Sequence, residues 1–479
     1  MLLIFSLPLL VISLFAFDGA LRVGMVALSI LLLNMGVFAI VNRIDKRCYA
    51  YKFYMVEAVL VPLFLFLNVT FFSRQTEELM ASTSLFSEIP WSLLSLCLSP
   101  LFALAFAVCI GQWLSNYRRP SFDGYFSEVN PAFDVVSLLL IAPVLGGWIA
   151  QIIQISSISF AMAILNKTFM FFPFIAGYRY RFNRPVWLIW AGVLALGVVA
   201  AALTGNRGLG FFPAFYFVIG FGLSFKRKYL YFFGLICAMV AALYLSGISS
   251  AIRETIGRKT LSNFSIVEVV EAWPEIMRKM STNTDMTAGV SESNPFYKGM
   301  KRMVQWTRIV VPNMAGEGVP YRGTDELMLD YKSFFFFSKF TGITGIQFYP
   351  SVMHARPYGF TVNMAATKAI STVPFGVEMD GWSRRGVWGA SLYLCVLFAT
   401  MAIFERINQA VSKRNPNVRL LCLSVIWGLP FSYFWTYGII QTTRQYVLQF
   451  ILAVVLAYGL DYLAKRLMFY FPRLGRGVK

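Results

Sequence analysis

Residues 186–224 read VWLIWAGVLALGVVAAALTGNRGLGFFPAFYFVIGFGLS, and this stretch decides the fold class. Two apolar runs, 186–203 and 209–224, flank the turn Thr204-Gly205-Asn206-Arg207-Gly208. Each run approaches the ~20 residues that a helix needs to cross a bilayer. A fixed cation between two such runs costs free energy unless it meets an anion or the aqueous boundary. The stretch therefore predicts a membrane hairpin with Arg207 at its tip.

The composition of the whole chain extends this reading. Of its 479 residues, 58% are hydrophobic, and the mean hydropathy is +0.63. These values predict an all-α polytopic membrane protein. We expect about twelve transmembrane helices, near residues 1–17, 23–42, 53–72, 91–114, 135–155, 157–177, 186–203, 209–224, 229–246, 387–404, 419–439 and 446–464. The first run lacks the basic start and cleavage site of a signal peptide, so we interpret it as a retained span.

The charges of the connecting loops predict an orientation. With the N-terminus inside, the inside loops and the C-terminal tail carry 21 lysines and arginines. The short outside loops carry only Arg22, Arg74, Arg207 and Arg444. This bias follows the positive-inside rule, so both termini are predicted to be cytoplasmic and Arg207 to face outward. Because the net charge of +19 lies in short caps at span ends, it does not indicate a nucleic-acid partner.

The chain divides into three predicted parts. Residues 1–246 form an N-terminal bundle of about nine spans, 247–385 a large outside loop, and 386–479 about three spans with a basic tail. The loop is rich in apolar residues, which favours a folded, partly helical cap over a disordered linker. Within it, Ser265-Ile266-Val267-Glu268 fits a capping box that opens an amphipathic helix to Met280, kinked at Pro274.

Three cations are candidates for binding a phosphate group at the outer membrane boundary. Arg207 and Arg444 lie in short outside loops, where the alternative role is that of a snorkelling anchor. Arginine suits a phosphate because its planar fork donates two parallel hydrogen bonds. Lys167 lies either at the middle of a span or, as we prefer, at the outer start of one, with 151–166 lying along the interface.

The large loop adds a second set of candidates. Arg302, Arg308 and Arg322 accompany the aromatic residues Trp306 and Tyr321. This set forms either a solvated basic face or a surface on which the arginines bind phosphate and the aromatic rings stack on sugars.

Two residues are candidates for a general base. Glu378 shortly precedes the tenth span, and His354 is the only histidine of the chain. Either side chain could accept the proton of an attacking sugar hydroxyl. No CxxC or Cys/His spacing is present, so we expect no metal site and no cofactor.

Several of these features occur together in one known family. They are the turn Gly205-Asn206-Arg207-Gly208, the Lys167-Thr168-Phe169 run, the late outside loop, its Pro374, Glu378, Gly386, Gly389 approach to the next span, and the final Arg444 hairpin. In this layout the chain resembles the bacterial oligosaccharide repeat-unit polymerases, the O-antigen polymerases of the Wzy type.

The resemblance implies an integral-membrane glycosyltransferase of GT-C-like fold in the bacterial inner membrane, with its large loop in the periplasm. Its substrate would be an undecaprenyl-diphosphate-linked oligosaccharide, and its partners membrane lipids, a chain-length regulator and a flippase. Three alternatives stay open: an O-antigen ligase, which depends on a loop histidine, a lipid-linked oligosaccharide flippase or other transporter, and a non-catalytic scaffold.

Overall fold

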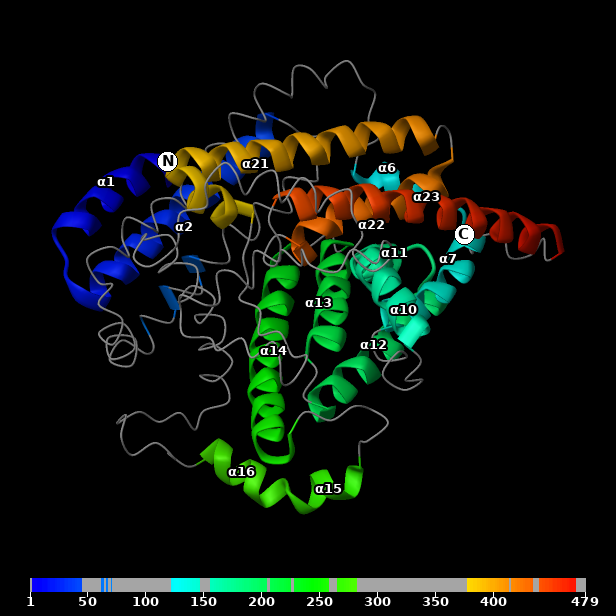
Figure 1. Ribbon diagram of the computed structural model, residues 1–479, viewed down its shortest axis with the longest axis horizontal. Coiled ribbons are helices and arrows are strands. Elements are labelled where there is room, and N and C mark those ends of the chain that lie inside the picture. Colours follow the sequence, from blue (N-terminus) through cyan, green and yellow to red (C-terminus); the bar gives the residue numbers. More distant parts are fainter. Residues whose placement is uncertain are drawn as a thin grey trace, which may run out of the picture. The chain divides into compact units, whose positions relative to one another are not determined.

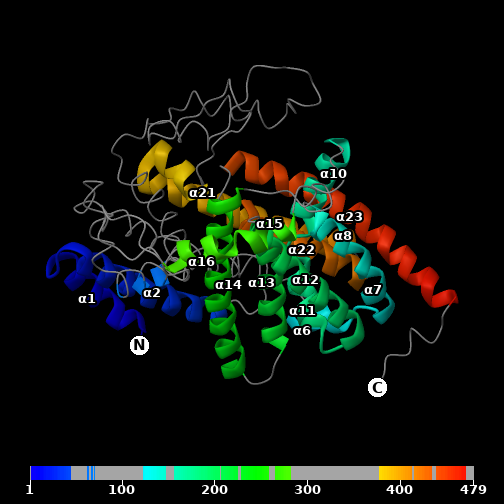
Figure 2. The same ribbon diagram turned by 90° about the horizontal axis from the view of Figure 1, so that it is seen from below.

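The computed structural model describes residues 2–44, 62–63, 66–67, 70, 122–146, 156–204, 207–224, 228–257, 265–281, 377–412, 415–433 and 439–470. Across these residues the regular structure is helical, without a strand, which confirms the all-α class for this part of the chain. Figures 1 and 2 show the helices from two directions. The first half contains α1 (Leu2–Phe15), α2 (Gly19–Ile44), α6 (Phe122–Ser127), α7 (Pro131–Val136), η1 (Ser137–Leu140), α8 (Ile141–Val144), α10 (Ser156–Phe169), α11 (Phe172–Arg179) and α12 (Arg184–Thr204). The second half contains α13 (Arg207–Ser224), α14 (Lys228–Ile256), α15 (Ile266–Glu271), α16 (Trp273–Ser281), α21 (Val377–Ser412), α22 (Pro416–Tyr433) and α23 (Ile439–Tyr470).

Several described helices have the composition of membrane spans. Leu21–Ile40, Arg184–Thr204 and Tyr446–Tyr470 are long and apolar enough to cross a bilayer. Shorter apolar helices cover Ile4–Phe15, Pro131–Val144 and Gly210–Ser224. These segments are consistent with a membrane protein. The count of twelve spans and the orientation stay predictions, since 91–114 and most of 53–72 lie outside the described residues.

The chain forms two compact units. The first comprises Met1–Arg119, Met303–Arg406 and Leu429–Val447; the second comprises Pro120–Arg302, Ile407–Gly428 and Leu448–Lys479. Each unit draws on distant parts of the sequence. The predicted division at 246 and 385 stays a prediction, because most of the large loop lies outside the described residues.

In the first unit α1 and α2 form a hairpin. Gly19 opens α2 with a φ of 57°, a conformation that glycine adopts without steric cost. The hydroxyls of Ser13 and Ser29 lie 3.3 Å apart across the hairpin. Each also donates to a carbonyl one turn earlier in its own helix, so these buried polar groups are satisfied within apolar surroundings.

In the second unit α11, α12 and α13 pack closely through glycines. A Cβ at Gly177 would overlap the backbone of Phe217, and one at Gly220 would overlap the carbonyl of Phe174. Small residues allow such close approach, which gives apolar helices their main packing attraction inside a bilayer. The observed α12 and α13 match the predicted runs 186–203 and 209–224 within two residues at each end.

The predicted N-cap of the capping box is confirmed at the start of α15. Ser265 is the N-cap, and its hydroxyl accepts a hydrogen bond from the amide of Glu268 at 3.4 Å. The helical hydrogen bonding continues through Ala272, because its amide donates to Glu268 and its carbonyl accepts from Ile276. α15 and α16 therefore form one interrupted helical run that ends at Ser281, as the amphipathic pattern predicted.

Candidate functional site

Arg207 is the first residue of α13. Near this residue α12 and α13 approach closely at Gly210, where a Cβ would overlap the carbonyl of Gly197 and the side chain of Ala201. The first four amide groups of a helix lack intrahelical partners and carry the positive end of the helix dipole. The backbone around Arg207 therefore offers an N-terminal helix turn, held in place by a tight contact between two helices.

Lys167 lies near the end of α10 and is exposed. The helix is interrupted after it by turn residues 170–171, and the next helix, α11, has only 8 residues. Such a helix is about 12 Å long, too short to cross a bilayer by itself. α10 already begins at Ser156, so no described helix begins at Lys167, which lies inside a helix that packs on α8. The position of Lys167 relative to the membrane stays a prediction. Asn166 beside it donates a hydrogen bond to the carbonyl of Val144.

Arg444 and Glu378 lie within helices of the first unit. Arg444 was expected in a loop, but α23 already begins at Ile439 and includes it. Glu378 is the second residue of α21, which begins ten residues before the predicted span. Since Arg207 and Lys167 belong to the second unit, a site shared by all four residues stays a prediction.

The remaining predicted residues lie in the large loop. They fall outside the residues that the structure describes: His354, Arg302, Arg308, Arg322, Trp306 and Tyr321.

A dense polar network occupies the other end of the α12–α13 hairpin. Four segments meet there: α6 with the start of α7, the end of α11, the turn between α21 and α22, and the last part of α23. We call it the basal network; its members are Asp123, Glu128, Asn130, Asp134, Tyr178, Arg179, Arg181, Asn415, Asn417, Arg419, Asp461 and Lys465. All four segments lie beside loops that the charge pattern predicts to be cytoplasmic.

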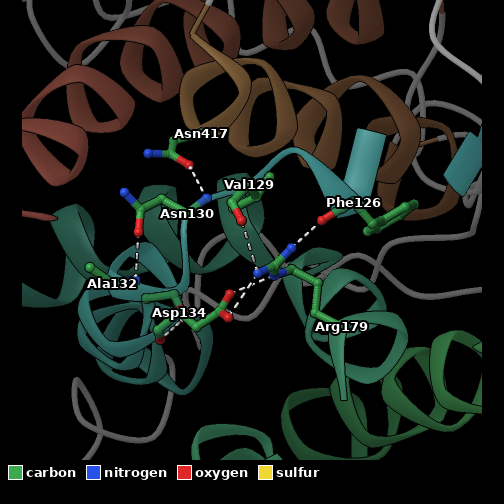
Figure 3. A network of polar contacts seen from close by, with 8 residues as sticks. Phe126, Val129, Asn130, Ala132, Asp134, Arg179 and Asn417 are labelled. Carbon is green, nitrogen blue, oxygen red and sulfur yellow. Dashed lines mark hydrogen bonds and ion pairs between the residues drawn. The ribbon is translucent and has the colours of Figure 1, made fainter. Parts of the chain in front are cut away.

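The centre of the basal network is a buried ion pair between Arg179 and Asp134 (Figure 3). Arg179 Nε lies 2.5 Å from Asp134 Oδ1, and Nη2 lies 2.8 Å from Oδ2, so the contact is bidentate. The same guanidinium also donates to the carbonyls of Phe126 and Val129. The two side chains are only 2% and 1% exposed. A buried charge is tolerated when its hydrogen bonds are satisfied in this way.

A second part of the network joins α7, α22 and α23. The backbone amide of Asn130 donates to Asn417 Oδ1 at 3.1 Å (Figure 3). Asn417 Nδ2 in turn donates to Asp461 Oδ1 at 2.7 Å. Asn415 and Lys465 bind the other carboxylate oxygen of Asp461, each at 2.6 Å. Asp461 therefore ties the start of α22 to α23.

In the basal network, arginines that the sequence placed in loops form ion pairs with acidic residues. The charge pattern of the sequence counts Arg179, Arg181 and Arg419 only among the inside-loop cations that predict the orientation. The structure pairs them with Asp134, Asp123 and Glu128 respectively. Because these charges neutralise one another, the network suits a structural role better than ligand binding.

One further buried charge was missed. Glu405 lies in α21 and is 4% exposed. The predicted span ended at residue 404, so Glu405 counted as part of a loop, whereas α21 continues to Ser412. Within the same unit Tyr446 is fully buried, and its ring stacks on that of Phe404 with centroids 5.6 Å apart. If α21 crosses the membrane as the sequence predicts, an ionisable residue buried in it is a functional candidate.

Within the described residues no group of three or more His, Cys, Asp or Glu side chains gathers as a metal site would require. The expectation of a metal-independent protein stays a prediction. Comparison with protein-family models, with curated proteins and with solved structures finds no match to this chain.

Proposed function

We propose that the protein polymerises undecaprenyl-diphosphate-linked oligosaccharide repeat units on the outer face of the bacterial inner membrane. The observation that carries the proposal is the position of Arg207. It begins α13 at the end of the hairpin opposite to the basal network. α12 separates the two ends by 21 residues, about 30 Å, which is the thickness of a bilayer core. With the basal network in the cytoplasm, Arg207 lies at the outer boundary.

The local chemistry at Arg207 suits a diphosphate. A guanidinium and the free amides of a first helical turn both favour an anion, and their effects add. Gly208 and Gly210 have no side chain to keep a ligand from the backbone. The close contact of α12 and α13 at Gly210 fixes this turn before the substrate arrives, which reduces the cost of reorganisation.

The reaction is a transfer at the anomeric carbon of the donor glycan. A hydroxyl of the acceptor repeat unit attacks this carbon, its proton passes to a base, and the bond to the diphosphate oxygen breaks. The diphosphate leaves on its lipid with the bonding electron pair. Arg207, with Arg444 and Lys167 as further candidates, offsets the negative charge that develops on it. Glu378 and His354 are the candidate bases, and the large loop holds the acceptor.

The test removes the charge at Arg207. In cells that lack the chromosomal copy, we expect Arg207→Ala to abolish long polymer at a normal protein level, while Arg207→Lys retains part of it. Arg184→Ala is the matched control, because Arg184 is an exposed arginine at the opposite end of α12. Long polymer in Arg207→Ala cells would refute the assignment.

A binding measurement separates substrate recognition from indirect effects on polymer length. Purified protein is titrated with undecaprenyl diphosphate and followed by native mass spectrometry. Loss of one charge-assisted hydrogen-bonding group predicts about 10- to 100-fold weaker binding for Arg207→Ala. Equal affinity of the variant and the Arg184→Ala control would contradict a direct contact.

Two alternative functions make different predictions. A ligase needs its loop histidine, so loss of activity in His354→Ala would favour a ligase, and full activity would favour a polymerase. A lipid-linked oligosaccharide transporter is the second candidate, and the buried Glu405 favours it. Glu405→Gln would then stop translocation of a fluorescent lipid-linked glycan into vesicles, whereas a polymerase would show no such translocation in either form.

A further inference from the structure

α15 and α16 form an amphipathic run with three distinct faces. The first face packs on the end of α14. Val269 and Ile276 are buried, at 4% and 0% exposure, against Ala251 and Ile252 of α14. Lys279 adds a hydrogen bond to the same contact, since its ammonium group donates to the carbonyl of Glu254 at 3.2 Å.

A second face is apolar but not covered by the described residues. Ile266, Val270, Trp273 and Met277 are 67%, 64%, 41% and 43% exposed. Their spacing of four, three and four residues places them on one side of the helical run. We call these four residues the apolar stripe. Exposed apolar residues in such a continuous row indicate a surface that contacts lipid or another apolar partner.

The third face is charged. Glu268, Glu271, Glu275 and Arg278 follow one another on the remaining side of the run. Arg278 Nε lies 2.8 Å from Glu275 Oε2, and its hydrogen bond lowers the pKa of the Glu275 carboxyl. This charged face suits contact with water. A helix with an apolar side and an ionised side suits the boundary between lipid and water.

The point on α14 at which α15 and α16 pack indicates which level of the membrane they lie at. Ala251 and Ile252 lie 23 and 24 residues after Lys228, the first residue of α14. At 1.5 Å per residue this is about 35 Å. A bilayer core is ~30 Å thick, and the headgroup regions extend the total to ~40–45 Å. If Lys228 marks the inner edge of the core, the run lies among the outer headgroups.

The direction of the run agrees with this position. Figure 1 shows α15 and α16 running across the end of α14 instead of continuing along it, and in Figure 2 the run again lies crosswise to α14. Gly257, with a φ of 78°, ends α14 and allows the chain to turn there. A helix lying across a span at the headgroup level lies in the plane of the membrane.

We propose that the apolar stripe inserts into the outer leaflet of the phospholipid bilayer and so holds the start of the large loop on the membrane surface. The proposal rests on the predicted orientation, in which α14 crosses the membrane from the cytoplasm. Trp273 lies in the middle of the stripe, and tryptophan prefers the interface between headgroups and acyl chains. The stripe would thus fix the loop beside the level at which Arg207 lies.

The test measures what each face of the run contacts. A nitroxide label is placed singly at Ile266, Val270 and Met277, or at Glu268 and Glu271, in the full chain with its six cysteines replaced. The protein is reconstituted in vesicles of phosphatidylethanolamine and phosphatidylglycerol. We expect the ratio of collisions with oxygen to collisions with a water-soluble nickel chelate to be severalfold higher at the stripe positions.

Two other outcomes would overturn the proposal. Equal access of the nickel chelate to both sets of positions would show that the stripe lies in water. Low access of both reagents to the stripe alone would show that protein covers it, either the rest of the loop or a partner.

A label at Val240, which is 48% exposed on α14, separates these failures from a wrong orientation. This position should report the bilayer core. If it contacts water, α14 does not span, and both this proposal and the outward position of Arg207 fall together. If it reports lipid while the stripe does not, only the inference about the stripe fails.

Discussion

The two ends of the α12–α13 hairpin differ in what their charged groups meet. At the basal end Arg179 is buried and bound by Asp134 and by two carbonyls of the same unit. At the other end Arg207 is the first residue of α13, where the amides of the first helical turn add positive charge instead of neutralising it. A cation whose partners come from its own chain stabilises the fold. A helix N-terminus favours an anion, and the proposal that Arg207 binds one rests on this difference between the two ends.

The largest expected effect is on the basal end. Asp134→Ala should lower the free energy of unfolding by about 3–5 kcal/mol, because it leaves the Arg179 guanidinium buried without its carboxylate. Thermal unfolding of purified protein in detergent measures the change. The double variant Asp134→Leu with Arg179→Met should recover most of the stability, since an apolar pair replaces the ion pair. If the double variant were as unstable as Asp134→Ala, the unpaired charge of Arg179 would not be the cause of the lost stability.

The second prediction concerns the close packing of α12 and α13 near Arg207, which a larger side chain at Gly210 should disturb. Gly210→Leu pushes against the carbonyl of Gly197 and should cost about 1–3 kcal/mol. Because the contact fixes the turn that carries Arg207, polymer length should fall even in the folded fraction. Gly192→Leu is the matched control, since nothing lies within 4 Å of a Cβ at Gly192 on α12. Long polymer made by folded Gly210→Leu protein would show that the packing does not position Arg207.

The smallest effect is expected at the rim of the basal network. Arg181 forms an ion pair with Asp123 at 2.9 Å, but the two side chains are 35% and 66% exposed. Arg181→Gln should therefore change the free energy of unfolding by less than about 1 kcal/mol. The unfolding temperature of this variant should match that of the unchanged protein. A loss as large as that of Asp134→Ala would mean that burial does not decide the energy of these pairs.

The parts of the fold that sequence predicted are those that depend on local pattern. The lengths of α12 and α13 follow from two apolar runs bounded by polar residues. The start of α15 follows from the hydroxyl of Ser265, which can reach the amide of Glu268 in any context. Such features need no knowledge of distant residues.

The parts that were missed depend on tertiary contacts or on the absence of a helix breaker. The pairing of Arg179 with Asp134 joins residues 45 apart, and nothing in either local sequence marks it. Arg444 was placed in a loop because its neighbours are polar. However, no glycine or proline occurs between Ile439 and Arg444, so the helix continues through them. The shared site of Arg207, Arg444 and Glu378 stays a prediction for the same reason, since it needs contacts between distant segments.

The basal network also has a consequence for how the protein is made. Arg179 can find Asp134 soon after both are synthesised, roughly 2–9 s apart at the usual pace of a ribosome. Asn130 must wait for Asn417, 287 residues later, which takes roughly 15–60 s. During that interval the early helices have to stay inserted without their final partners.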